Sequence, residues 1–117
     1  MNSHWTGYWE QRGMGRQPME DLSLQLADGL IRGGGRDIIG LFTFYGRMEL
    51  DGRVLMMKQY IGRHSVAYAG QYDGEGTIFG TWSIEAWDSG DFLLRLSRTE
   101  GSGAEQAITT LQPSGPG

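Results

Sequence analysis

The stretch that decides the fold is residues 52–82, which read GRVLMMKQYIGRHSVAYAGQYDGEGTIFGTW. Turn-forming pairs at Gly62-Arg63 and Asp73-Gly74 divide it into three runs. Side chains alternate along a strand, so every second residue of a run shares one face. That face carries Val54, Met56, Lys58, Tyr60, His64, Val66, Tyr68, Gly70, Tyr72, Ile78, Gly80 and Trp82. Such a mixture of apolar, aromatic and ionisable side chains is more typical of a pocket lining than of a core built only for stability.

The rest of the chain continues this pattern of strands and turns. Asp-Gly turns recur, and Pro18 predicts that the second strand begins after it, because proline cannot donate to a ladder. The alternation slips by one residue near Arg36-Asp37, which requires either a turn or a bulge. We expect strands at about 4–12, 19–27, 30–35, 38–48, 53–61, 64–72, 77–87 and 91–97, with a turn at Asp88-Ser89-Gly90. The predicted fold is all-β, an eight-stranded antiparallel up-and-down β-barrel.

Composition limits the classes of partner. The 117 residues carry a formal charge of −4, which argues against nucleic acid and against an anionic membrane surface. The absence of cysteine excludes disulfides, thiolate metal sites and a cysteine nucleophile. The sequence begins with no signal-peptide pattern and contains no apolar run long enough for a membrane helix. We expect a soluble, cytoplasmic protein with one barrel domain over residues 1–99 and a tail over 100–117, rich in Gly, Ser and Pro, that is partly disordered or adds a short strand at 107–111.

Short motifs in the first and last strands carry a family resemblance. Trp5-x-Gly7-x-Trp9, the run Gly80-Thr81-Trp82 and Arg95 in the final FLLRL run are similar to features of the calycin-type barrels, the avidins and lipocalins. The chain resembles avidins more than lipocalins, because it is short and its loops are tight. The resemblance implies a ligand-binding barrel with Arg95 over the first-strand tryptophan. It does not extend to biotin binding, since Gly7 stands where a polar residue is expected.

Four residues are the strongest candidates for a site: Lys58, Tyr60, His64 and Tyr68. A lysine inside the barrel needs a partner, either Asp37, the nearest acidic residue in phase, or an anionic ligand group such as a carboxylate or phosphate. The alternative is that the faces are reversed and Lys58 is in solvent. The body of the ligand would lie against Phe42, Trp5 and Trp82, although these tryptophans can equally be core. His64 is either a general base or a histidine at the barrel rim that bonds to backbone.

The opposite face carries apolar residues that predict self-association. If the first face is inside, the outer wall carries Leu41, Tyr45, Leu55, Met57, Ile61, Phe79 and Leu93. Such a patch is larger than a monomer usually exposes, so we expect a dimer or tetramer through the barrel walls.

Three functions remain open. The first is a non-enzymatic barrel that binds a small apolar or aromatic ligand with a polar or anionic group. The second is an enzyme, such as a cyclase or isomerase, with acid–base chemistry on Lys58, a tyrosine or His64. The third is a structural or protein-interaction barrel with a filled lumen. We predict no catalytic triad, metal site or cofactor, since no motif for any of them is present.

Overall fold

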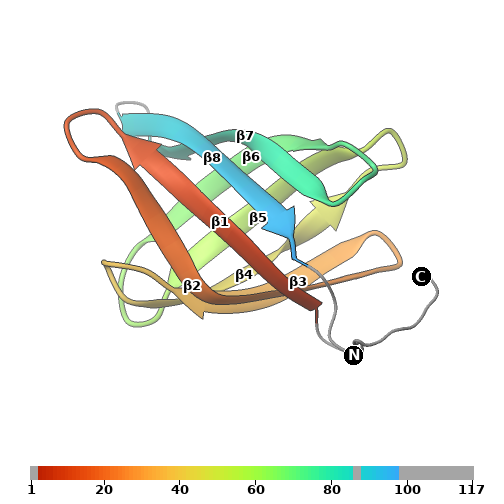
Figure 1. Cartoon of the computed structure of the whole chain (residues 1–117), viewed down its shortest axis with the longest axis horizontal. Coiled ribbons are helices and arrows are strands. Elements are labelled where there is room, and N and C mark those ends of the chain that lie inside the picture. Colours follow the sequence, from red (N-terminus) through yellow and green to blue (C-terminus); the bar gives the residue numbers. More distant parts are fainter. Residues whose placement is uncertain (1–2, 86–87, 98–117) are drawn as a thin grey trace.

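The computed structural model describes residues 3–85 and 88–97 as one closed barrel (Figure 1). Each strand pairs antiparallel with the next, and β8 pairs with β1, so the sheet has no free edge. The strands are β1 Ser3–Gln11, β2 Gly15–Ala27, β3 Leu30–Arg36, β4 Leu41–Met48, β5 Arg53–Tyr60, β6 Ser65–Tyr72, β7 Thr77–Ile84 and β8 Asp88–Leu96. The predicted eight-stranded up-and-down barrel is therefore confirmed.

The inner face is the one that the alternation of residues 52–82 indicates. Along β5, β6 and β7, the buried side chains of this face point into the lumen. The alternative in which the two faces are exchanged and Lys58 is in solvent is therefore wrong. Those side chains are Val54, Met56, Lys58, Tyr60, Val66, Tyr68, Ile78 and Trp82. All of them except Lys58 join Phe42, Phe44, Leu22, Leu24, Ile31, Phe92 and Leu94 from the other strands in one hydrophobic cluster. Most of the lumen is therefore filled by side chains.

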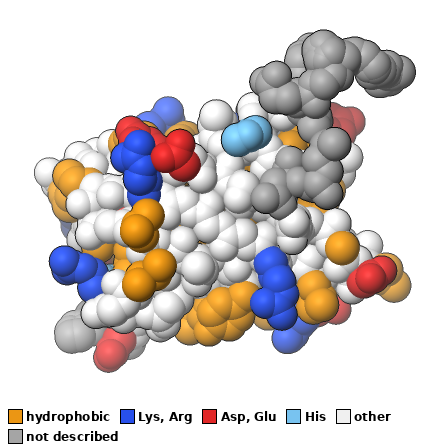
Figure 2. All heavy atoms as spheres, turned by 90° about the horizontal axis from the view of Figure 1, so that it is seen from below, with side chains coloured by type: hydrophobic (Ala, Val, Ile, Leu, Met, Phe, Trp, Pro, Cys, Tyr) orange, Lys and Arg blue, Asp and Glu red, His pale blue; other side chains and the backbone are white. Residues whose placement is uncertain are grey.

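The predicted outer-wall residues do lie outside. Leu41, Tyr45, Leu55, Ile61 and Phe79 are each 45 to 62% exposed, and Met57 and Leu93 are partly exposed. Figure 2 shows one side of the barrel, where hydrophobic side chains lie on the surface beside positively charged ones.

The strands β2 and β8 both begin earlier than predicted. Pro18 lies within β2, opposite Tyr8 of β1. It is tolerated there because β3 pairs with β2 only from Glu20 onward, so one side of β2 is open at Pro18. On the other flank of β1, Asp88-Ser89-Gly90 is not a turn but the start of β8, where Gly90 pairs with Trp82. A side chain at Gly90 would collide with the Glu10 carbonyl and the Trp82 ring, so this glycine serves close packing rather than a turn.

The phase slip near Arg36-Asp37 is a turn. β3 ends at Arg36 and β4 begins at Leu41 instead of Ile38, which leaves Asp37–Gly40 as a loop between them. The Asp37 amide donates to the Gly40 carbonyl at 3.1 Å and closes this loop. The predicted tail of 100–117 and its optional strand at 107–111 lie outside the described residues. None of the described residues forms a helix that could cross a membrane.

Candidate binding site at the barrel mouth

The β3–β4 loop, Asp37–Gly40, reaches one mouth of the barrel because the end of β3 packs closely on its neighbours. Gly33 and Gly35 lie against the backbone of β2, and a side chain at Gly33 would collide with the Ser23 carbonyl. At Gly35 an added Cβ would lie 3.0 Å from the Glu20 carbonyl and 3.1 Å from the Phe42 ring. Glycine therefore lets the chain pass close enough for the Asp37 side chain to point inward.

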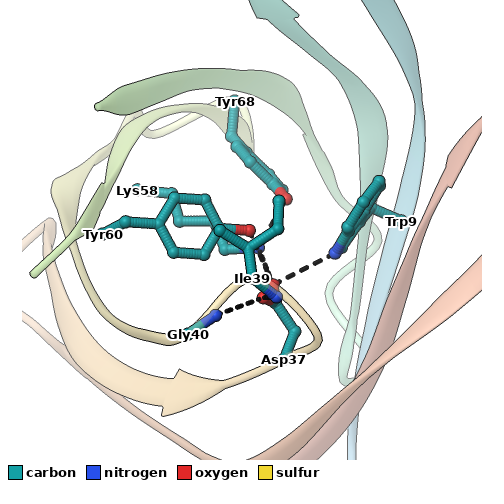
Figure 3. Close-up of polar contacts among 7 residues, drawn as sticks. All are labelled: Trp9, Asp37, Ile39, Gly40, Lys58, Tyr60 and Tyr68. Atoms are coloured by element: carbon teal, nitrogen blue, oxygen red, sulfur yellow. Dashed lines mark hydrogen bonds and ion pairs between the residues drawn. The ribbon is translucent and has the colours of Figure 1, made fainter. Parts of the chain in front are cut away.

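The Asp37 carboxylate is the centre of a buried polar network (Figure 3). Its Oδ2 accepts hydrogen bonds from Lys58 Nζ at 2.7 Å, Tyr60 Oη at 2.7 Å and Trp9 Nε1 at 3.1 Å. Its Oδ1 accepts the backbone amides of Ile39 at 2.9 Å and Gly40 at 3.4 Å. The barrel wall thus holds one carboxylate oxygen, and the loop's own backbone holds the other.

Lys58 is the only lysine in the chain, and its side chain is 1% exposed. Besides Asp37, its ammonium contacts the Tyr68 hydroxyl at 3.2 Å. The same Nζ lies 4.3 Å from the centre of the Phe42 ring and 4.9 Å from that of Tyr60. The cation therefore has one full counter-charge and the electron-rich faces of aromatic rings around it.

Burial and pairing set the charge states of this network. Burial would raise the pKa of Asp37, but the hydrogen bond and charge of Lys58, with the bonds from Tyr60 and the Ile39 amide, hold that pKa below its ordinary value. Burial lowers the pKa of Lys58 from 10.5 to about 8, and Asp37 opposes a further fall. The pKa values of Tyr60 and Tyr68 are raised, mainly by burial, so both hydroxyls stay protonated. At neutral pH the site contains an ion pair and two phenol groups.

A small cavity of about 40 Å³ opens above this network at the mouth. Its lining residues are Trp9, Gln11, Ile39, Tyr60, His64, Val66, Tyr68, Trp82, Ile84 and Asp88. Trp9 and Trp82 meet edge to face, with ring centres 5.9 Å apart. Among the described residues the Tyr68 hydroxyl accepts from Lys58, and no acceptor for its own proton is found. The mouth can therefore offer a hydroxyl proton to a polar group that enters it.

The structure brings together most of the predicted site residues. Lys58, Tyr60 and Tyr68 share the network, and Phe42 packs on the Lys58 ammonium. Trp82 lines the mouth cavity and donates to the Glu10 carbonyl at 2.9 Å. The exposed His64 follows the β5–β6 turn, with its ring centre 5.2 Å from that of Tyr60.

Trp5 is not part of this group. It lies four residues before Trp9 on β1 and borders a different hollow with Leu24, Tyr72 and Leu96. Its buried Nε1 has no hydrogen-bond partner among the residues that the structure describes. The predicted contact of Arg95 with this tryptophan is wrong, because Arg95 lies opposite Thr6 on the outer face whereas Trp5 points inward.

One member of the network, Trp9, was not among the predicted site residues. Its alternation with Trp5 places it inside, but its distance from Asp37 depends on how far the strands are staggered around the barrel, which no local pattern gives. A stronger signal was available for Lys58. The sequence has nine arginines but one lysine, and that lysine shares a strand face with apolar residues. Both facts distinguish Lys58 from the other cations.

The described residues contain no group of three side chains that could hold a metal ion. Within them, the site offers instead a set of hydrogen-bond donors beneath an aromatic opening. Comparison of the chain with models of known families, with curated proteins and with solved structures gave no match.

Proposed function

We propose that the protein is a small-molecule-binding barrel whose ligand enters at the mouth between Trp9, Tyr60, His64 and Trp82. The observation that carries this proposal is the buried Lys58–Asp37–Tyr60 network directly beneath an aromatic-lined opening. Burying two charges is costly, and an apolar filling of the same volume would often stabilise the barrel as well or better. A polar network directly beneath an opening is explained if its groups bind and orient a ligand that enters there.

The lining indicates the character of the ligand. Trp9 and Trp82 offer flat apolar surface, while the Lys58 ammonium and the Tyr60 and Tyr68 hydroxyls offer polar anchoring. We therefore expect an apolar or aromatic body with one polar or anionic group. The open cavity is only about 40 Å³, well below the roughly 300 Å³ or more of a typical ligand pocket, so binding requires the Asp37–Gly40 loop to move.

This proposal also keeps the kinship with the calycin-type barrels as a hypothesis. In support, the chain closes as eight sequential strands, and Trp5 and Trp9 of the first-strand motif both point into the lumen. These features are shared architecture, and the ligand has to be argued from the site itself.

The second candidate is a structural barrel with a filled lumen. The observation that favours it is the fullness of the interior, where Val54, Ile78 and Leu94 are 0% exposed and their neighbours nearly so. In this case the buried ion pair would only fix the position of the β3–β4 loop.

Native mass spectrometry of the protein purified from its own host separates the two candidates. A binding barrel should retain a stoichiometric small molecule, which denaturation releases for identification. His64→Ala, at an exposed position of the mouth, should weaken retention without disturbing the core, and Arg95→Met on the outer face is the matched control. Bare protein, together with no thermal stabilisation by a library of small aromatic and aliphatic compounds, would instead establish the structural barrel.

A further inference from the structure

We infer that the Asp37 carboxylate occupies the place of a ligand carboxylate, so that the ligand of this barrel is a small monocarboxylic acid that displaces the β3–β4 loop. This inference rests on the proposed binding function and names its ligand class.

The donors that recognise Asp37 belong to the rigid wall and not to the loop. Trp9 comes from β1, and Lys58 and Tyr60 come from β5; all three donate to the same oxygen, Oδ2. A free carboxylate that placed one oxygen at this position would find the same donors already oriented. The Tyr68 hydroxyl, 3.2 Å from Lys58 Nζ, can donate to its second oxygen.

The charge of the site fits a monoanion. Among the residues that the structure describes, the network contains one cation, Lys58, and no arginine. A single carboxylate keeps the buried charge balanced when Asp37 leaves, because it replaces one negative charge with another. A phosphate dianion would bring an unbalanced charge into a site that lacks the guanidinium groups usually paired with it.

The loop is attached in a way that permits this exchange. Within the described residues, every hydrogen bond from Asp37–Gly40 to the barrel's side chains runs through the Asp37 carboxylate. The remaining attachment is the half-buried Ile39 at the mouth, while Ile38 is 71% exposed. A competing carboxylate therefore satisfies the wall donors and releases the loop in one step. As the loop leaves, the space that Asp37 and Ile39 fill joins the mouth cavity and admits the body of the acid.

The sole lysine provides the test. Protein labelled with ¹³C-lysine gives one side-chain signal set, from Lys58. In Asp37→Ala the site has lost its carboxylate, and benzoate or phenylacetate should bind, restore the melting temperature toward that of the wild type and shift the Lys58 Cε signal. Benzamide and phenylacetamide have the same shape without the charge, and they should bind at least about tenfold more weakly. The wild type should bind the same acids about tenfold or more weakly than Asp37→Ala, because the acid must first displace the loop carboxylate.

Two controls guard the result. Asp91→Ala removes an exposed carboxylate from β8 and should respond to the acids as the wild type does. Asp37→Ala/Lys58→Met should respond to none of them. If Asp37→Ala does not fold, the acid titration of the wild type, monitored at Lys58, still decides the question.

Each other outcome has one meaning. Equal response to acids and amides, or no response of Lys58 in either protein, would overturn the carboxylate class. A non-acidic molecule retained by the native protein would keep the binding function and refute this inference. Uptake of acids by Asp37→Ala alone, with none bound by the wild type at any concentration, would leave the receptor chemistry intact but refute displacement of the loop by an acid. The binding function itself would still be decided by native mass spectrometry.

Discussion

At the scale of the residue, Lys58 and Asp37 form a pair in which each charge offsets the free-energy cost of burying the other. Both side chains are enclosed, at 1% and 0% exposure, and 2.7 Å separates their charged atoms. Alternation in the sequence placed Lys58 inside and named Asp37 as a partner in phase, and the structure confirms both. The sequence alone did not give the bond that Trp9 donates to Asp37, because it depends on the stagger of the strands around the barrel. Nor did it give the bond that Lys58 donates to the Tyr68 hydroxyl on the neighbouring strand β6.

The pair predicts a strong coupling between the two positions. Lys58→Met should lower the free energy of unfolding by about 3–5 kcal/mol, because it leaves the Asp37 carboxylate buried without a cation. The double variant Lys58→Met/Asp37→Asn removes both charges and should recover most of that loss. Urea denaturation of the single and double variants measures the coupling, with Arg95→Met expected to lie within about 0.5 kcal/mol of the wild type. Losses that simply add would show that the two residues do not act as a pair.

The pKa of Lys58 gives a second prediction at this scale. The Cε signal of the single lysine should titrate with a midpoint near pH 8 in the folded protein, against 10.5 for an ordinary lysine. A midpoint near the ordinary value would mean that the ammonium is in contact with water.

The direction of the resulting stability change follows from proton linkage. Between pH 8 and pH 10 the unfolded chain holds the Lys58 proton and the folded chain has released it. In this interval the free energy of unfolding should therefore gain up to about 1.4 kcal/mol per pH unit from this group. Denaturation of the wild type and of Lys58→Met across the interval isolates the contribution, since only the wild type contains a lysine. An identical slope in the two proteins would contradict it.

At the scale of the element, glycine has two different roles in these strands. In the Asp28-Gly29 turn both residues have positive φ, of 55° and 76°, and the Asp-Gly pattern predicted the turn correctly. At Gly90 the same residue type lies in a strand and provides room for the Trp82 ring. Sequence alone does not separate these roles, because the need for room comes from a neighbouring strand far away in the chain. For the same reason the start of β2 was predicted too late. The sequence does not show that β3 leaves one side of β2 unpaired at Pro18, where proline is tolerated.

Close packing by glycine can be tested on β6 and β7. Gly70 and Gly80 pair across these strands, and a Cβ at Gly80 would lie 2.5 Å from the Gly70 Cα. Gly80→Ala should therefore cost about 1–3 kcal/mol of stability through overpacking. Thr81→Ala, at the next position of the strand and on the outer face, should change stability by less than about 0.5 kcal/mol. Thermal or urea denaturation of both variants gives the comparison, and a neutral Gly80→Ala would show that the two strands can separate without loss.

At the scale of the whole molecule, we propose the outer wall of β4, β5 and β6 as the surface that binds a second copy of the chain. Ala67 and Ala69 lie beside the larger Tyr45 and Leu55 in a shallow groove of about 560 Å³. Along the strand register, Arg32 and Arg47 flank the groove on the β3–β4 side, and Asp91 lies beyond it on β8. A two-fold axis between β5 and β6 would bring the arginines of one copy toward the aspartate of the other.

We accordingly expect a dimer in solution. Gel filtration with light scattering at micromolar concentration should give twice the chain mass. Ala67→Glu, which places a charge in the groove, should give the monomer, whereas Thr6→Lys on the outer face of β1 should not. A wild type that elutes as a monomer would remove this prediction, and it would leave the apolar wall to be explained in another way.

The reactivity of the single lysine side chain can report on opening of the barrel. Lys58 carries the only side-chain amine of the chain, and the closed mouth shields it from solvent. Amine-selective acylating reagents leave arginine unmodified, so apart from the α-amino group they can react only when the mouth opens. Peptide mapping separates these two products, and the rate of acylation at Lys58 then counts openings of the native protein without any introduced label. If the loop moves as proposed, the residue that anchors the closed form thereby also reports how often the barrel opens.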